Sequence, residues 1–408
     1  MSDFLPKELI FEILLKLPVK SLLCFTTVCK LWHSLITSSE FIFSHLSISA
    51  SKEDNTLFLR RYTKNDRAEH YTLLKDGENQ TFELQSSLEL HFPLKSQFGY
   101  FRIVGCSNGL VCLSDDFFTN PSQPIILWNP CIRKHMVLPA PTVKPEKAHF
   151  FVLGCGATRH DFKVVRMVYS KTNDFTLNLP AIVEIYSLTS GTWRRVHFDD
   201  RYVIMEFMWS QAFIEGTVHW LAFYSLEYPT QNQLFCNLIL TFHMEDEVFG
   251  EIMLPDELAR EAVTYLSITV IGKSLGAIKY DKQMGSESCC VWVMKEYGVM
   301  KSWTKLYDID LVGGMEKVIR FRNNGGVLLA SQEHELVTYN PETRVNKAIG
   351  IHGSPRSFYI DNYMESLVLL VGQNVVADEQ LLTASSHISQ SSKVVQEPEH
   401  NLMRRLAL

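Results

Sequence analysis

Residues 5–46 read LPKELIFEILLKLPVKSLLCFTTVCKLWHSLITSSEFIFSHL. In this stretch apolar side chains recur at steps of three and four, which is the spacing of one face of an α-helix. The pattern predicts helices over residues 6–17, 20–25 and 27–36, followed by a fourth helix that Ser39 caps. Pro18 ends the first of them, because proline lacks the N–H that a helix interior needs. Residues 1–46 are therefore predicted to form a small all-α module.

This helical module carries more apolar surface than it can enclose. A chain of roughly forty residues usually needs disulfides, a metal or a partner to fold alone. Part of its apolar surface is therefore expected to be buried either on the following domain or on another protein. Periodicity alone leaves both possibilities open.

After a Ser-rich connector, placed at residues 47–56, the pattern changes to short apolar or alternating runs, which are typical of β-strands. Turn residues such as Asn108-Gly109 and Asn129-Pro130 separate the runs. The predicted strands cover residues 57–62, 69–74, 100–104, 110–113, 125–128, 163–169, 182–186, 218–223 and 236–242. Residues 57–374 are thus predicted to form an all-β domain.

A weak repeat runs through this domain. A strand with an aromatic residue, a polar turn and a further strand recur at intervals of roughly 45 to 60 residues, near the period of about 50 of propeller blades. The five copies cover residues 128–137, 186–196, 242–252, 292–307 and 339–349. Strands predicted at 357–360 and 365–370 are expected to pair with those at 57–62 and 69–74, which would close a ring of about six blades. A sandwich or an irregular pair of sheets is the structural alternative.

Two further predictions concern local segments. The polar, Ser/Gln-rich residues 375–408 are predicted to be a disordered tail. Gly154-Cys155-Gly156 lacks the third glycine of a dinucleotide-binding fingerprint and is predicted to be a turn. Six tryptophans are predicted to pack in the core or between blades: Trp128, Trp193, Trp209, Trp220, Trp292 and Trp303.

The first 46 residues resemble an F-box in the order and spacing of their motifs: Leu5-Pro6, Glu12-Ile13-Leu14, Leu17-Pro18-Val19-Lys20-Ser21-Leu22 and Val28-Cys29-Lys30-x-Trp32. The resemblance implies docking onto a Skp-type adaptor protein and, through it, onto a cullin-RING ubiquitin ligase. The residues that it implies in contacting the adaptor or supporting the contact surface are Leu5, Pro6, Leu9, Ile13, Leu14, Leu17, Pro18, Leu22, Val28, Cys29 and Trp32.

The β domain resembles the F-box-associated domain of plant F-box proteins, which implies a kelch-like β-propeller. The stretches that carry this likeness are 105–113, 127–134, 161–166, 183–193 and 291–305. Residues 363–370 also resemble the S-locus F-box branch of that family. That branch includes determinants of self-incompatibility, so an S-ribonuclease is one candidate target, although other members of the branch lack that role.

Contacts with a target protein are expected in loops, because the shared motifs are strand and turn residues that build the scaffold. Three long loops rich in polar and aromatic residues are candidates, at 115–123, 169–179 and 224–233. The residues singled out in and beside them are Asp115, Phe117, Phe118, Asn173, Phe175, Tyr224 and Tyr228.

Other classes of partner find little support. The net charge of −6, with acids and bases interspersed, argues against nucleic acid. We find neither a secretory signal nor an apolar run of the roughly 20 residues needed to span a bilayer, so we expect no membrane contact. The expected location is the cytoplasm, with the nucleus as a second candidate. The nine scattered cysteines are predicted to be reduced core residues, and the histidines show no metal-ligand spacing, so we predict no metal and no cofactor.

Catalysis has one candidate. Residues 105–109 fit the G-x-S-x-G pattern in which Ser107 would be a nucleophile, but that motif needs a strand-to-helix turn, and residues 110–113 are predicted to be a strand. A hairpin is therefore favoured. The leading hypothesis is a non-catalytic receptor subunit of a ubiquitin ligase. A β-propeller hydrolase that uses Ser107, and a binding protein whose helical module serves another purpose, are the alternatives.

Overall fold

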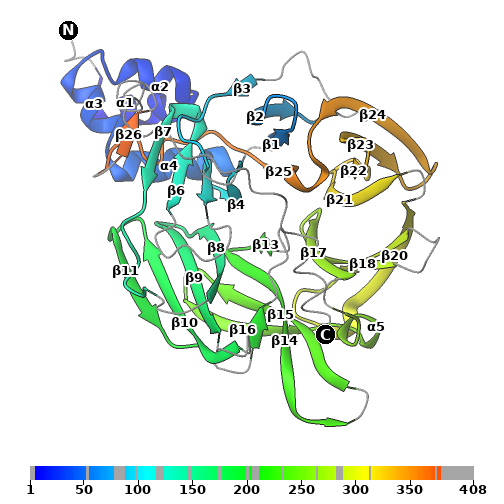
Figure 1. Cartoon of the computed structure of the whole chain (residues 1–408). Coiled ribbons are helices and arrows are strands. Elements are labelled where there is room, and N and C mark those ends of the chain that lie inside the picture. Colours follow the sequence, from blue (N-terminus) through cyan, green and yellow to red (C-terminus); the bar gives the residue numbers. More distant parts are fainter. Residues whose placement is uncertain are drawn as a thin grey trace.

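The N-terminal helices lie beside a ring of β-sheets in the computed structural model (Figure 1). The structure describes residues 5–51, 55–77, 88–96, 99–115, 124–144, 149–171, 177–198, 202–204, 211–230, 233–262, 265–281, 288–311, 314–372 and 375–377. None of the helices within these ranges combines the length and apolar character that a membrane crossing requires.

Four helices form the N-terminal module: α1 (Lys7–Leu15), α2 (Val19–Phe25), α3 (Lys30–Ile36) and α4 (Ser39–Ala50). The predicted cap was one residue off, because the hydroxyl of Ser38 accepts the hydrogen bond from Phe41 N at 3.2 Å. The third helix begins later than predicted, at Lys30, with Cys29 as its N-cap. The prediction of a connector starting at residue 47 was wrong, since α4 continues to Ala50 and buries Leu46.

The strands of the described residues form six antiparallel sheets, which are the blades of a propeller. The predicted fold class, a small all-α module followed by a β-propeller of about six blades, is confirmed. Blade I contains β25 (Tyr359–Asn362), β1 (Thr56–Thr63), β2 (Ala68–Lys75) and β3 (Leu88–Leu90). Blade II contains β4 (Arg102–Ser107), β5 (Leu110–Ser114), β6 (Ile125–Asn129), β7 (Lys134–Val137) and β26 (Val375–Ala377). Blade III contains β8 (His149–Ala157), β9 (Phe162–Lys171), β10 (Leu177–Ser187) and β11 (Thr192–Val196).

Blades IV to VI complete the ring. Blade IV contains β12 (Tyr202–Ile204), β13 (Gln211–Ile214), β14 (Thr217–Thr230), β15 (Gln233–His243) and β16 (Val248–Met253). Blade V contains β17 (Leu266–Ile271), β18 (Ser274–Asp281), β19 (Ser288–Met294) and β20 (Trp303–Asp310). Blade VI contains β21 (Met315–Phe321), β22 (Val327–Ser331), β23 (Glu335–Asn340) and β24 (Val345–His352). Short helical turns lie between strands: η2 (Pro130–Ile132), α5 (Asp256–Ala259), η4 (Met300–Ser302) and η5 (Pro355–Ser357).

The five sequence repeats correspond to one structural unit. Each is the third and fourth strand of a blade, namely β6–β7, β10–β11, β15–β16, β19–β20 and β23–β24. The aromatic residue that marks each repeat lies on the third strand, where its ring packs in the core. Trp128, Tyr186, Phe242 and Tyr339 are all buried. The repeat was detectable because in these five blades a large side chain at this position fills space in the packing between blades.

The ring closes as predicted, by pairing of the two ends of the domain. Strand β25 pairs antiparallel with β1, with Leu57 opposite Asn362 and Arg60 opposite Tyr359. Closure removes an open sheet edge from the first blade. The strand predicted at residues 365–370 does not exist. Those residues instead run from blade I towards blade II without joining a ladder.

The chain adds one more strand after this segment. Val375 and Val376 of β26 pair with Met136 and His135 on the outer edge of blade II. The prediction that disorder begins at residue 375 was therefore wrong for residues 375–377. The rest of the predicted tail lies outside the described residues.

The prediction of a turn at Gly154-Cys155-Gly156 was also wrong, because all three residues lie within β8. The two glycines leave space for rings from blade IV. A Cβ on Gly154 would overlap the ring of Trp220, and one on Gly156 would overlap the ring of Phe213. Of the six tryptophans, four are buried, Trp292 is half-buried and Trp209 lies outside the described residues.

The helical module shares its hydrophobic core with blades II and III. Leu14, Leu22 and Phe41 from the helices belong to the same cluster as Leu127 of blade II and Val164 of blade III. Helix α2 packs against η2, and the ring of Phe43 meets that of His160 edge-on at 5.8 Å. Part of the excess apolar surface of the module is therefore buried on the following domain, which is one of the two possibilities that the sequence left open.

Candidate functional site

The outward face of the helical module exposes large apolar side chains. Leu5, Leu9, Ile13 and Val28 are 50–60% exposed. Leu9 and Ile13 lie one turn apart on α1, so they share one side of that helix. On an adjacent side of α1, about 100° around the helix, Ile10 and Leu14 are buried in the core shared with the propeller. Helix α1 thus has two apolar sides, and the fold covers only one of them.

The structure separates the eleven residues predicted for adaptor contact by their exposure. Seven are exposed (Leu5, Pro6, Leu9, Ile13, Pro18, Val28 and Cys29), two are half-buried (Leu17 and Trp32), and two are buried (Leu14 and Leu22). Leu14 and Leu22 are 1% and 0% exposed, so their part is to hold the helices in place. Trp32 packs edge-on against Phe25 with ring centroids 5.1 Å apart. We call the seven exposed residues the outer surface of the module.

A C-terminal segment, residues 363–372, fastens the module to the ring, and we call it the clasp. Leu367, Leu369 and Leu370 are buried in the shared core. Asn129 Nδ2 donates hydrogen bonds to Ser366 O at 3.0 Å and Val368 O at 2.7 Å. Figure 1 shows the clasp running from β25 towards β26, close to the helices. The same segment therefore follows the strand that closes the propeller and supports the module.

Gly109 shows how closely the clasp approaches blade II. Its φ is +75°, a region that favours glycine, and a Cβ there would lie 2.5 Å from Ser366 Oγ and 2.7 Å from Met364 O. Asn108 also has a positive φ, so the two residues form the two-residue turn of the β4–β5 hairpin. The hairpin interpretation of residues 105–109 is confirmed. The strand-to-helix turn of a serine nucleophile is not formed here.

The turns of each blade lie at two opposite ends of the propeller. The module-side face carries the β4–β5 turn, η2 and the β8–β9 turn, as the contacts of α2 with η2 and of Phe43 with His160 establish. Because the strands are antiparallel, the β5–β6, β9–β10 and β14–β15 connections emerge at the opposite end, which we call the distal face. The described strand ends that flank all three loops predicted for target contact are therefore on the same distal face.

Few of the predicted loop residues can be described individually. Asp115, at the base of its loop, is buried and accepts a hydrogen bond from Ser96 Oγ at 2.5 Å. Phe117, Phe118, Asn173 and Phe175 lie outside the described residues. Tyr224 and Tyr228 belong to β14, whose hairpin with β15 extends beyond the other blades in Figure 1.

Two of the distal connections meet at their bases. Tyr169, near the end of β9, donates its hydroxyl to Tyr202 O at 3.2 Å. Tyr202 pairs with Tyr224 in the β12–β14 ladder. The hydrogen bond thus joins strand β9 of blade III to strand β12 of blade IV, which pairs with β14. It gives the distal face a rigid support beneath its loops.

A half-buried carboxyl lies among charged groups near the same face. Burial raises the pKa of Glu69 to about 7, and the nearby Arg60 guanidinium opposes that shift. Glu69 Oε1 accepts a hydrogen bond from Phe101 N at 2.9 Å. This contact joins blade I to the residue that precedes blade II, so the protonation of Glu69 is linked to the packing of two blades.

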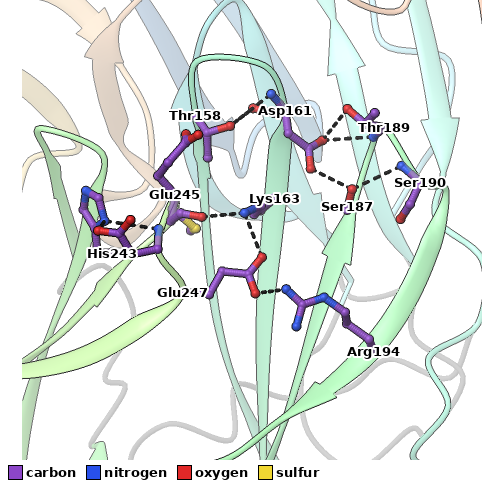
Figure 2. Close-up of polar contacts among 12 residues, drawn as sticks. Thr158, Asp161, Lys163, Ser187, Thr189, Ser190, Arg194, His243, Glu245 and Glu247 are labelled. Atoms are coloured by element: carbon purple, nitrogen blue, oxygen red, sulfur yellow. Dashed lines mark hydrogen bonds and ion pairs between the residues drawn. The ribbon is translucent and has the colours of Figure 1, made fainter.

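Charged side chains also join blades III and IV on the module-side face (Figure 2). Lys163 Nζ lies 2.7 Å from Glu247 Oε1 and donates to Met244 O at 2.7 Å. Glu247 pairs in addition with Arg194. Asp161 accepts hydrogen bonds from the turn between β10 and β11, including one from Thr189 N at 2.9 Å. Because these groups are engaged with one another across two blades, the network favours a structural role.

Metal chemistry finds no support within the described part of the chain, where no group of three or more histidine, cysteine or acidic residues is arranged to hold an ion. Several buried thiols have raised pKa values because burial disfavours the thiolate. Cys289 and Cys131 both rise to about 12. These cysteines are therefore protonated packing residues at neutral pH.

Comparison with known proteins gives two family matches along this chain. Residues 3–44 match the F-box domain, and residues 56–373 match the F-box associated beta propeller domain. The chain is 26% identical over 392 residues to F-box protein CPR1 of Arabidopsis thaliana, covering 90% of this chain and 89% of that protein. It is 27% identical over 344 residues to an F-box/kelch-repeat protein of the same plant, covering 82% of this chain and 87% of that protein.

Proposed function

Because the chain belongs to the family of F-box proteins with an F-box associated β-propeller domain, we propose that it is the substrate-recognition subunit of a Skp–cullin–F-box ubiquitin ligase. The F-box binds the Skp-type adaptor, and the propeller binds a target protein for ubiquitination and proteasomal degradation. The observation that carries this proposal is the outer surface of the module. It remains apolar and exposed although other residues of the same helices are buried in the core shared with the propeller.

The exposed apolar residues supply the driving force for adaptor binding. Fully burying an aliphatic side chain contributes about 1.5–3 kcal/mol. Leu5, Leu9, Ile13 and Val28 are half or more exposed, so an adaptor that covers them would gain several such contributions. Pro6, Pro18 and Cys29 are exposed beside them.

The role of the propeller is positioning. The shared core and the clasp hold the F-box on blades II and III, so a target on the propeller would be kept at a fixed place relative to the adaptor. Holding target and ubiquitin-charged enzyme together raises the effective concentration of target lysines. This role needs no catalytic group in the chain, and we propose that the protein is not itself an enzyme. A location in the cytoplasm, where such ligases act on soluble proteins, is part of the proposal.

The nature of the target is a separate question. The likeness to the S-locus branch rests on residues 363–370, and these form the clasp, where Leu367 and Leu369 pack against the module. Packing accounts for the apolar character of these residues, so they support no choice of an S-ribonuclease over another protein. The distal loops around Asp115, Asn173 and Tyr224 are the proposed target contacts.

Adaptor binding by the purified chain tests the proposal. The parent is compared with a Leu5→Ala, Pro6→Ala double variant and with Val345→Ala, a matched change at an exposed valine on blade VI. We expect the parent to bind a Skp-type adaptor with micromolar or tighter affinity, which corresponds to about −8 kcal/mol or better. The double variant should lose at least tenfold, and Val345→Ala should bind like the parent.

A folded parent that does not bind any Skp-type adaptor would show that the F-box serves another purpose, and the ligase assignment would fail. Equal weakening by Val345→Ala would show that the loss is not specific to the outer surface. Circular dichroism of each variant confirms that the comparison is between folded proteins.

A further inference from the structure

Outside the F-box, exposed large apolar side chains gather in one loop of blade V among the described residues. Tyr297, Val299 and Met300 of the β19–β20 connection are 48%, 39% and 43% exposed. Other exposed apolar residues of the propeller, such as Leu88, Ile182 and Val345, occur singly on different blades. Single exposed residues need no explanation, whereas a group of them marks an interaction surface.

This loop is held in one shape by its own hydrogen bonds. Lys295 N donates to Ser302 O at 3.2 Å, and Glu296 N donates to Ser302 Oγ at 3.1 Å. Gly298, with φ +77°, provides the turn, and its N–H points to Met294 Sδ at 3.1 Å. A loop that is already ordered loses little conformational freedom when a partner binds it.

The exposed tyrosine is also fixed to the neighbouring blade. His219 of β14 is fully buried, and its Nε2 lies 2.7 Å from Tyr297 Oη. Burial lowers the pKa of His219 to about 4, so the ring is neutral at neutral pH. Its Nδ1 lies 3.2 Å from Ala212 O, an acceptor, so Nδ1 carries the proton and Nε2 accepts from the tyrosine hydroxyl. Tyr297 thus presents a rigid ring, which is typical of residues that dominate binding.

Positive charge surrounds the apolar group. Lys295 and Lys301 flank it in the loop, and both are exposed. Lys273 lies in the β17–β18 turn, which is next to the loop because Gly276 pairs with Val293 in the β18–β19 ladder. No ion pair within the described residues involves any of these three lysines. Two exposed acidic residues partly offset this positive charge: Glu296 in the loop and Glu215 in the adjacent turn of blade IV.

We propose that Lys273, Lys295, Tyr297, Val299, Met300 and Lys301, here called the blade V surface, form a docking site for an acidic segment of a partner protein that carries aromatic or long aliphatic side chains. The apolar side chains of the partner pack on Tyr297 and Met300, and its carboxylates pair with the unengaged lysines. This complementarity selects an acidic partner over a basic one. The proposal deepens the proposed receptor function by adding a target-contact site on the module-side face, away from the distal loops.

The test is selection from a phage-displayed library of random 12-residue peptides on the full chain in complex with its Skp-type adaptor. Enriched peptides should contain aspartate or glutamate together with aromatic or leucine residues. Their affinities are then measured by fluorescence anisotropy on three variants. These are Tyr297→Ser with Met300→Ser, Lys295→Glu with Lys301→Glu, and the control Leu88→Ser with Val345→Ser, whose residues are similarly exposed on other blades.

We expect both blade V variants to bind the enriched peptides at least tenfold more weakly, and the control to bind within twofold of the parent. Enrichment of basic or uncharged peptides, no enrichment, or equal affinity for all variants overturns the proposal. Self-association of the parent through this surface also overturns the proposal, because the surface would then bind a second copy of the chain. It would be seen as a dimer that the Tyr297→Ser, Met300→Ser variant converts to a monomer. Adaptor affinity is measured for the parent and every variant. If the parent does not bind the adaptor, the ligase function is contradicted, and the peptide selection is made on the full chain alone so that it still tests the blade V surface.

Discussion

The F-box and the propeller treat their apolar side chains differently. The propeller places them between blades, so the large residues that mark its repeats, such as Trp128 and Phe242, are buried by other blades. The F-box covers one side of its helices with the propeller and leaves Leu9 and Ile13 in solvent. The difference shows that large apolar side chains are left exposed in particular places and buried elsewhere in this protein. Apolar surface is left open on a rigid support, where a partner can bury it without reshaping the chain.

The largest expected effect concerns a buried ion pair inside the propeller. Arg166 Nη1 lies 2.7 Å from Glu184 Oε2, and the Glu184 side chain is fully buried. Replacing Glu184 by Gln removes the charge of one partner of this buried pair, which typically costs about 3–5 kcal/mol. We expect that loss in the free energy of unfolding measured with denaturant. Glu316→Gln is the control, because its pair with Arg356 is partly exposed to solvent and should contribute less than about 1 kcal/mol.

The second prediction compares neighbours on α1. Leu14→Ala should lower the free energy of unfolding by about 2–4 kcal/mol, because it leaves a cavity in the shared core. Ile13→Ala should change stability by less than about 0.5 kcal/mol, because Ile13 is 53% exposed, while weakening adaptor binding by about 1 kcal/mol or more. Thermal unfolding and adaptor titration of both variants measure the two effects. Similar stability losses would contradict the two-sided description of the helix.

Glu69 should make stability depend on pH. Its pKa is raised from 4.5 to about 7 in the folded protein, so the folded state holds this proton more tightly than the unfolded state. Stability therefore falls as pH rises from about 4.5 to about 7, by on the order of 1–3 kcal/mol. Arg60, Tyr71 and Asp115 are the charged or titratable groups that influence it. Urea unfolding between pH 4.5 and 8 should show a smaller fall in Glu69→Gln than in the parent, and parallel curves would rule this origin out.

The smallest effect is expected at the blade V surface. Tyr297→Phe removes the hydrogen bond to His219 Nε2 but keeps the ring, so the free energy of unfolding should drop by about 0.5–1.5 kcal/mol. Differential scanning calorimetry measures the change. Val345→Ser, at an exposed side chain that has no hydrogen-bonding group, should change stability by less than about 0.5 kcal/mol. A loss at Tyr297 no larger than at Val345 would mean that the hydrogen bond contributes little.

Sequence reasoning identified the local elements well where one residue pattern decides the structure. The helical spacing of residues 5–46 predicted four helices, and the aromatic repeat predicted the third and fourth strands of five blades. The pairing of the two domain ends, now seen between β25 and β1, was also predicted. Periodicity succeeds here because alternating burial within a strand or helix depends on near neighbours in the chain.

Predictions failed where a distant segment decides the local structure. Gly154 and Gly156 suggested a turn, but they lie in a strand because Trp220 and Phe213 of the next blade occupy the space of their side chains. Residues 365–370 suggested a strand, yet they pack on the F-box and bond to the side chain of Asn129. Residues 375–377 suggested disorder, but the outer edge of blade II pairs with them.

The sequence by itself determined the helices, most strands, the approximate number of blades and the family resemblance, because each of these depends on patterns within tens of residues. Only the tertiary structure decided which side of α1 faces the propeller, and therefore that Leu14 supports the module while Ile13 is exposed. It also brought together Lys273 and the loop around Tyr297, and set His219 beneath that tyrosine. Helical and strand periods give the directions of side chains along one element, whereas a binding surface depends on which elements meet in space.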